Sequence, residues 1–333
     1  MEVVAFHYPD TRGRLLVESA NLFPVRVLAV IVLYEQTPQD SVSFQTLDAA
    51  IKHARPGKLS LKTFFYDNTP GGQASSKYPD KSSYEAPGEN RGIAEAYNRA
   101  IEIAYQEGFD WLLTLDQDTK LPIDFLDNLA DTVAFVTPLK KVAAVAPLLY
   151  DKTRLISPSA GPYATSPKQF SEEFIGISME KSTWALNSAS TVRVSALRSI
   201  GGYDSRFWMD YSDAVMYHRL ESNGMRVFVA GNIRVEHELS VLDMKNRVSP
   251  ARYEAILGAE SAYFDECMGR TANRQLLVKS IYRSFYKFWG RGGNRAYSKI
   301  ACRFLYRRLF YSRKRRMETW EHSVRSRLVK SNV

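Results

Sequence analysis

Residues 27–34, Val-Leu-Ala-Val-Ile-Val-Leu-Tyr, form an uninterrupted apolar run that is rich in β-branched side chains. The run has the length of a strand, and it lacks the alternating polar residues of a strand with one face in water. A strand that is apolar on both faces must be covered on both faces, as in a parallel sheet flanked by helices. The run therefore predicts a parallel α/β sheet.

Strand and helix patterns alternate along much of the remaining chain. Further strands are predicted at 61–66, 111–115, 142–147 and 225–229, and helices at 41–54, 90–108 and about 122–137. Asn90 is expected to cap the second of these helices and Gly108 to end it. Residues 73–89 are predicted to form a mobile loop, and residues 151–182 a polar excursion. The alternation predicts a Rossmann-like α/β fold, a mostly parallel sheet with helices on both faces.

Positive charge is concentrated at the C-terminal end of the chain. The whole chain carries +9. Residues 271–333 hold 17 Lys and Arg against two acids, so this segment alone carries +15 and the first 270 residues carry −6. A mildly acidic body with a strongly basic tail indicates an anionic surface as partner.

Within this tail, residues 281–311 interleave aromatic and basic side chains. An apolar stripe at helical spacing consists of Tyr297, Ile300, Ala301, Phe304, Leu305 and Leu309. A second stripe, at steps of four, consists of Lys299, Arg303 and Arg307. Such a basic amphipathic helix is typical of segments that lie on an anionic membrane with the apolar side down. Nucleic acid is the alternative partner, but these cations lie outside the α/β body and follow amphipathic spacing, which favours the membrane.

The cysteine content bears on location and organisation. Cys267 and Cys302 have no CxxC spacing, which argues against a disulfide framework or a structural zinc site and fits a reducing cytoplasm. No segment approaches the roughly 18 continuous apolar residues of a spanning helix, and no signal peptide is recognised. We expect a cytoplasmic protein, peripheral on the inner face of the cell membrane.

The expected division of the chain has three parts. They are an N-terminal extension (1–24), an α/β domain (25–245) and a basic, helical, membrane-associating region (246–333).

Two carboxylates, Asp116 and Asp118, follow the predicted strand 111–115. Open α/β sheets bind ligands at the carboxyl ends of their strands, and side chains two apart in extended backbone point the same way. Two carboxylates held together repel each other unless a cation lies between them, and oxygen ligands suit Mg²⁺ or Mn²⁺. The alternative is a solvated turn between strand and loop.

A second acidic pair, Asp210 and Asp213, follows the glycine turn Gly201-Gly202. If a helix begins near Asp210, the two carboxylates share one face, and one of them could cap the helix while the other acts as a general base. Alternatively, both acids interact only with the helix dipole.

His237, in Val-Glu-His-Glu after the predicted strand 225–229, is either a metal ligand or a packed or surface histidine.

Taken in order, these segments resemble the family 2 glycosyltransferases of the GT-A type, and most closely the bacterial rhamnosyltransferases. The resemblance covers about residues 26–240. The segments that carry it are 30–34, 66–69, 89–94, Asn98, 115–119, 187–190, 200–204 and 207–213. Leu-Asp-Gln-Asp at 115–118 and Asp-Tyr-Ser-Asp at 210–213 are the parts that favour rhamnosyl transfer.

The resemblance implies an inverting transfer of rhamnose from dTDP-rhamnose to a lipid-linked or oligosaccharide acceptor in surface-polysaccharide synthesis. A UDP-hexose or galactofuranose donor is the alternative. The residues expected to bind the nucleotide sugar are Tyr34, Asp67, Asn90, Arg91, Gly92, Asn98 and Asp116. The residues expected to bind Mg²⁺ or Mn²⁺ are Asp118, Asp116 and His237. Asp213 is expected to be the catalytic base, with Asp210 as second candidate, because Val215 replaces an acid often found just after the base.

Overall fold

β1 (Val25–Leu33), which contains most of the predicted apolar run, lies between β2 (Leu59–Asp67) and β4 (Trp111–Asp116) and is parallel to both. The computed structural model describes residues 24–73, 82–161, 168–171, 174–177, 182–238, 248–287 and 295–330. Apart from Pro24, the predicted N-terminal extension lies outside the described residues.

The described residues place β1 in a nine-stranded sheet. Hydrogen-bonded neighbours follow the order β3-β2-β1-β4-β11-β5-β12-β9, and β6 pairs with β5. The other strands are β3 (Ser82–Glu85), β5 (Val142–Asp151), β6 (Arg154–Ser157), β9 (Gly176–Ile177), β11 (Ser190–Arg193) and β12 (Arg226–Glu236). Among the strands that the structure describes in this sheet, only β6, β9 and β11 are antiparallel to their neighbours, which confirms the mostly parallel arrangement.

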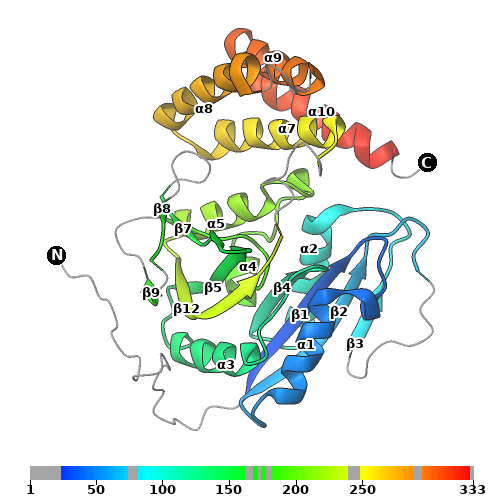
Figure 1. Ribbon diagram of the computed structural model, residues 1–333, viewed down its shortest axis with the longest axis vertical. Coiled ribbons are helices and arrows are strands. Elements are labelled where there is room, and N and C mark those ends of the chain that lie inside the picture. The colour runs from blue at the N-terminus through cyan, green and yellow to red at the C-terminus, as the bar shows by residue number, and fades with distance from the viewer. Residues whose placement is uncertain are drawn as a thin grey trace, which may run out of the picture.

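Helices cover both faces of this sheet, as predicted (Figure 1). They are α1 (Val42–His53), α2 (Gly92–Gln106), α3 (Phe125–Val136), α4 (Val194–Ser199) and α5 (Ser212–Ser222). Ala29 and Ile31 of β1 pack in the core formed with α1 and α3, whereas Leu28 and Val30 pack in the core formed with α2, α4 and α5. Burial of a Leu, Val or Ile side chain, as at Leu28, Val30 and Ile31, stabilises the fold by about 1.5–3 kcal/mol. The continuous apolar run is thus explained by two cores.

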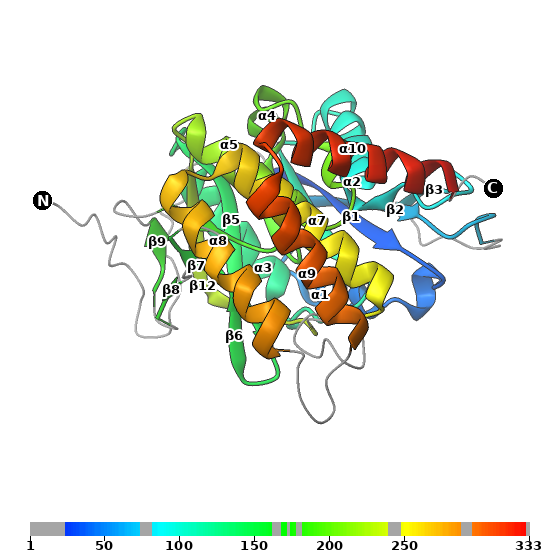
Figure 2. The ribbon, with the colours of Figure 1, turned by 90° about the horizontal axis from the view of Figure 1, so that it is seen from above.

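In the described part of the chain, four further helices follow the sheet and form a bundle above it (Figures 1 and 2). They are α7 (Pro250–Cys267), α8 (Arg270–Tyr282), α9 (Arg295–Phe310) and α10 (Arg313–Lys330), and a π-helical turn, Arg283–Lys287, extends α8. Tyr263 and Phe264 of α7 pack in one apolar cluster with Phe207 and with Val215 of α5. The bundle is therefore joined to the sheet domain by a continuous core.

Two buried acids of α7 hold the bundle together. Glu260 pairs with Lys279 at 2.9 Å and with Arg283, and Asp265 pairs with Arg308 and Arg316, each at 2.7 Å. Burial alone would raise the pKa of Glu260, but Arg283 and Lys279 lower it to about 2. Part of the positive charge of the C-terminal region is thus neutralised by buried acids inside the bundle.

Apart from Leu309, which is exposed, the predicted membrane-facing apolar stripe of α9 is packed inside the protein, so its predicted role is wrong. Tyr297 and Ile300 are buried in a cluster with Tyr253 and Leu257 of α7, and Phe304 packs against the same cluster. In addition, Arg303 pairs with Glu254 at 3.3 Å and Arg307 lies over the Phe304 ring. A helical apolar stripe indicates burial, but it does not distinguish a protein core from a lipid. No helix in the described part of the chain is long and apolar enough to cross a membrane.

Two local predictions also need correction. The predicted loop 73–89 contains β3, a parallel edge strand whose polar sequence carries no alternation signal, while residues 74–81 lie outside the described ones. The predicted excursion 151–182 contains β6 and β9. It also contains β7 (Ser159–Ala160) and β8 (Lys168–Gln169), which join β10 (Thr183–Trp184) in a small second sheet. Gly108, with φ +73°, follows the end of α2 as predicted.

Candidate active site

A cleft of about 630 Å³ lies where the carboxyl ends of the parallel strands meet the first helix of the bundle. From the sheet domain it is lined by Val32, Leu33, Tyr34, Asn68, Asn90, Ile93, Asp116, Gln117, Trp208 and Met209. From α7 it is lined by Ala251, Arg252 and Ala255. The cleft thus has one wall at the strand ends, where open α/β sheets bind ligands, and one wall from the C-terminal region.

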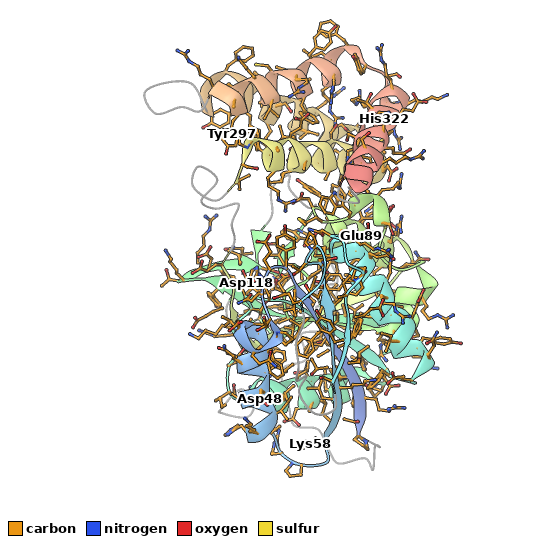
Figure 3. The ribbon with its side chains drawn as sticks, turned by 90° about the vertical axis from the view of Figure 1, so that its right-hand side faces the viewer. Asp48, Lys58, Glu89, Asp118, Tyr297 and His322 are labelled. Carbon is orange, nitrogen blue, oxygen red and sulfur yellow. The ribbon has the colours of Figure 1, made fainter. Side chains whose placement is uncertain are left out.

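Asp116, Asp118 and His237 come together at this edge of the sheet. Each offers a ligand atom, and these atoms lie within 4.8 Å of one another. His237 Nδ1 is 3.5 Å from a carboxylate oxygen of Asp118, and Nε2 is 3.9 Å from one of Asp116. Reciprocal backbone hydrogen bonds between Lys120 and Glu236 join the loop after β4 to the end of β12. Asp118 is labelled in Figure 3.

Neighbouring hydroxyl groups orient this group. Ser188 Oγ donates to one carboxylate oxygen of Asp116, and Tyr97 OH donates to the other at 3.4 Å. Ser188 and Thr119 lie within 3.5 Å of the two ring nitrogens of His237. Two carboxylates and an imidazole, held by outer hydroxyls, fit a divalent cation such as Mg²⁺ or Mn²⁺. Sequence reasoning gave no role to Ser188 or Tyr97, although Ser188 lies in the segment 187–190 that carries the resemblance.

The second acidic pair is split by the start of α5. Tyr211 occupies the N-cap position with φ +64°, and its side chain makes no capping hydrogen bond. Asp213 lies in the first turn and accepts a hydrogen bond from Ala214 N at 2.7 Å. Asp210 lies before the helix and pairs with Arg252 of α7 at 2.6 Å. The predicted capping role, and the shared helix face, are therefore wrong.

The two acids differ in their electrostatic surroundings. The pKa of Asp213 is raised to about 7, first by burial and then by the carboxylates of Asp116 and Asp210, against the opposing effect of the hydrogen bond from Ala214. A carboxylate with a pKa near neutral is suited to accept a proton at physiological pH. Asp210, by contrast, already has a cationic partner in Arg252 and connects the loop to α7. The raised pKa of Asp213 and the ion pair of Asp210 with Arg252 therefore favour Asp213 over Asp210 as a base.

Of the residues predicted to bind the nucleotide, some line the cleft and others do not. Tyr34 and Asn90 line the cleft, and Asn90 Oδ1 accepts from Gly92 N at 3.0 Å, although Arg91 and not Asn90 is the N-cap residue of α2. The Arg91 side chain pairs with Glu89 at 2.7 Å.

Two of the predicted nucleotide-binding side chains are engaged within the protein. Asp67 is fully buried, and its carboxylate accepts from Thr69 N at 2.9 Å and from Tyr84 OH at 2.5 Å. Asn98 uses both ends of its amide on the backbone of Tyr203, at 2.8 and 2.9 Å. Asn98 therefore connects α2 to the turn after α4, and it is not among the residues that line the cleft.

Asn68, Trp208 and Arg252 were not singled out from the sequence. Asn68 accepts from Arg91 N at 3.0 Å and donates to the carbonyl of Gly92 at 3.2 Å, so it connects the end of β2 with the start of α2. Asn68 and Trp208 lie in segments that carry the resemblance. Nothing in the sequence around Arg252 indicates that α7 contributes to a cleft.

Gly92 lets the start of α2 approach the backbone of Trp208. A Cβ at Gly92 would lie 2.3 Å from the carbonyl oxygen of Trp208, which also accepts from Ala94 N at 3.2 Å. Gly57 is a matched control, because its φ is also +82° and no atom lies within 4 Å of its Cβ position. We expect Gly57→Ala to destabilise the fold by about 1 kcal/mol through backbone strain. Gly92→Ala should cost about 1–3 kcal/mol more, through the clash. Equal losses in thermal unfolding would contradict this role.

Comparison with models of protein families and with curated proteins gave no match. Among solved structures, GalNAc-T7 with UDP, GalNAc and Mn²⁺ has a TM-score of 0.52 and 12% identity, over 92% of this chain and 58% of that chain. TarS of S. aureus has a TM-score of 0.46 and 13% identity, over 90% and 55%. TarS 1–349 in complex with UDP has a TM-score of 0.47 and 12% identity, over 79% and 73%. This chain thus spans little more than half the length of GalNAc-T7, and the likeness to GalNAc-T7 confirms the predicted GT-A fold.

Proposed function

We propose that this chain is a glycosyltransferase that moves a sugar from a nucleoside diphosphate donor to an acceptor hydroxyl with inversion of the anomeric centre. One observation carries the proposal. Asp116, Asp118 and His237 form a candidate cation site at the edge of the cleft. The negative charge of Asp116 also acts on the carboxyl of Asp213 and, together with burial, raises its pKa to about 7. UDP in the structure of GalNAc-T7, which has this fold, supports a nucleoside diphosphate as ligand.

The chemistry follows from these side chains. The acceptor hydroxyl attacks the anomeric carbon as Asp213 takes its proton, and the bond from the sugar to the diphosphate breaks in the same displacement. A divalent cation held by Asp116, Asp118 and His237 would supply Lewis-acid stabilisation of the charge that develops on the diphosphate. Tyr34 and Trp208 offer flat apolar surfaces for the base and sugar rings, and Arg252 offers a positive charge in the wall of the cleft.

The donor that we propose is dTDP-rhamnose, and a UDP-hexose or galactofuranose donor is the second candidate. The segments 115–118 and 210–213 support rhamnose. The acceptor would be a lipid-linked or oligosaccharide precursor of a surface polysaccharide, and the protein would act in the cytoplasm on the inner face of the membrane. The basic C-terminal region supports a polyanionic partner, and we propose an anionic membrane surface and not nucleic acid in this role.

A screen of nucleotide sugars tests the donor. We expect dTDP-rhamnose with Mn²⁺ or Mg²⁺ to raise the melting temperature by several degrees, since a ligand at 100 times its Kd stabilises by about 2.7 kcal/mol. UDP-glucose, UDP-galactose and UDP-galactofuranose should give smaller shifts. In the absence of acceptor the enzyme should hydrolyse the donor slowly, and EDTA should abolish both this hydrolysis and the shift. A larger shift with a UDP-sugar would move the proposal to the second donor class. No shift with any nucleotide sugar would contradict the function.

A further inference from the structure

Exposed apolar side chains gather on one face of the C-terminal bundle. In the described part of the chain, eleven large apolar side chains are exposed, and seven of them lie between residues 278 and 310. α8 and its π-helical extension contribute Val278, Ile281, Tyr282 and Phe285. α9 contributes Tyr306, Leu309 and Phe310. We call this surface the outer face. It differs from the apolar stripe of α9 that packs on α7.

The buried side chains of the same helices show which way the outer face points. Leu276 of α8 is buried, and Lys279 and Arg283 reach Glu260 of α7, so Val278 and Tyr282 lie on the side of α8 away from α7. α9 has the same polarity, with its buried stripe toward α7. Figure 2 looks down on this side of the molecule and shows α8 and α9 next to each other above α7.

The charge of the outer face is of one sign. No Asp or Glu occurs between Glu266 and Glu318. Arg274 on α8 and Arg295 and Lys299 on α9 are exposed. An exposed surface in which apolar side chains mix with cations, without any acid, complements an anionic surface that also has an apolar interior.

The two helices run in opposite directions, which interleaves the two kinds of side chain. Arg308, near the end of α9, contacts Asn273 near the start of α8, and Cys302 contacts the carbonyl of Ser284. The aromatic end of α9 therefore lies beside the basic start of α8. The basic start of α9 lies toward the apolar end of α8. The cations of each helix thus lie next to the exposed apolar side chains of the other, so both kinds of side chain are distributed over the face.

We propose that the outer face binds the surface of an anionic lipid bilayer. Val278, Ile281 and Leu309 decide between a bilayer and nucleic acid, the other polyanion that a basic aromatic surface could bind. Aliphatic side chains gain by entering the acyl boundary, whereas nucleic acid is bound by cations and by stacking on aromatic rings. The proposal identifies the membrane partner of the proposed transferase, but the binding itself does not rest on catalysis.

The test compares paired substitutions on the outer face with a matched pair elsewhere. Tyr282→Glu with Phe310→Glu places two acids on the outer face. Ile51→Glu with Ile123→Glu makes the same change in charge at two exposed apolar side chains of the sheet domain. The full chain is sedimented with vesicles of phosphatidylcholine containing about 30% phosphatidylglycerol. Controls are pure phosphatidylcholine and high salt. Donor hydrolysis is measured on the same samples, so that loss of the fold or of the proposed activity is seen separately.

We expect the unaltered chain and the Ile51/Ile123 variant to bind the anionic vesicles and to bind pure phosphatidylcholine much less. The Tyr282/Phe310 variant should bind the anionic vesicles at least about tenfold less, with unchanged hydrolysis. Equal binding by the two variants, or vesicle binding that duplex DNA abolishes while DNA itself binds more tightly, would overturn the proposal. Vesicle binding without any hydrolysis by any variant would contradict the proposed function and leave the membrane face standing.

Discussion

Asp213→Asn should lower turnover by about 10²–10⁴-fold while changing donor affinity by less than about twofold. The amide keeps the size of the side chain but cannot accept the proton of the acceptor hydroxyl. Donor affinity should persist because Asp213 acts only as the acceptor attacks. Turnover is measured with saturating acceptor, and donor affinity is measured by titration calorimetry. Asp210→Asn is the matched control, since Asp210 already pairs with Arg252, and it should lose far less turnover.

The same variant should be more stable than the natural chain at high pH. The pKa of Asp213 is raised from 3.8 to about 7 in the fold, so between these values the unfolded state releases a proton that the folded state keeps. Stability is therefore lost as the pH rises from about 4 to about 7, and the neutral amide of the Asp213→Asn variant avoids that loss. Melting temperatures in EDTA should be similar at pH 4.5, and the variant should melt several degrees higher at pH 8. A variant that is inactive yet more stable is not inactive through unfolding. If Asp213→Asn retains turnover, or if Asp210→Asn alone loses it, the base is misassigned.

Asp118→Ala should lower kcat/KM by about 100-fold or more, because the loss of one ligand weakens cation binding and with it the hold on the diphosphate. Asp48→Ala is the control. Asp48 is an exposed carboxylate paired with Lys52 on α1, and Figure 3 shows it farther from the C-terminal helices than Asp118. It should change kcat/KM by less than about twofold. Activity is measured across a Mn²⁺ titration, which should show a higher half-saturating concentration for Asp118→Ala. Unchanged activity in this variant, or full activity of the natural chain in EDTA, would rule out a cation at this site.

The central strands were predictable because their signal is strong and local. The run 27–34 is apolar and rich in β-branched residues, and residues 27–33 pack into the two cores on either side of the sheet. β3 was not predictable, because Ser82–Glu85 is a short edge strand of half-buried, mostly polar residues. Edge strands bury little, so their sequences carry little pattern.

The candidate site was predictable only in part, since its members meet through tertiary contacts. Asp116 and Asp118 are visible as a pair after a strand. His237 was tied to them by resemblance alone, and the backbone bridge between Lys120 and Glu236 that brings it there has no sequence signal. Arg252 lines the cleft although it lies in the region 246–333, which was predicted only to bind the membrane. Conversely, the resemblance implied a ligand contact for Asn98, whereas in the structure both ends of its amide are hydrogen-bonded to the backbone of Tyr203.

The position of α7 sets a minimum reach for a lipid-linked acceptor. α7 lines the cleft with Ala251, Arg252 and Ala255, and α8 and α9 lie on its other side. With the outer face on a bilayer, two helix layers separate the lipid headgroups from the reacting atoms, roughly 16–20 Å at ordinary interhelical distances. A single sugar on a lipid phosphate would fall short of that distance, whereas a chain of several sugars would span it. The enzyme would then extend glycans that another transferase has begun. Lipid-linked acceptors of graded length should show a threshold in activity on vesicles, and the same acceptors in detergent should show none.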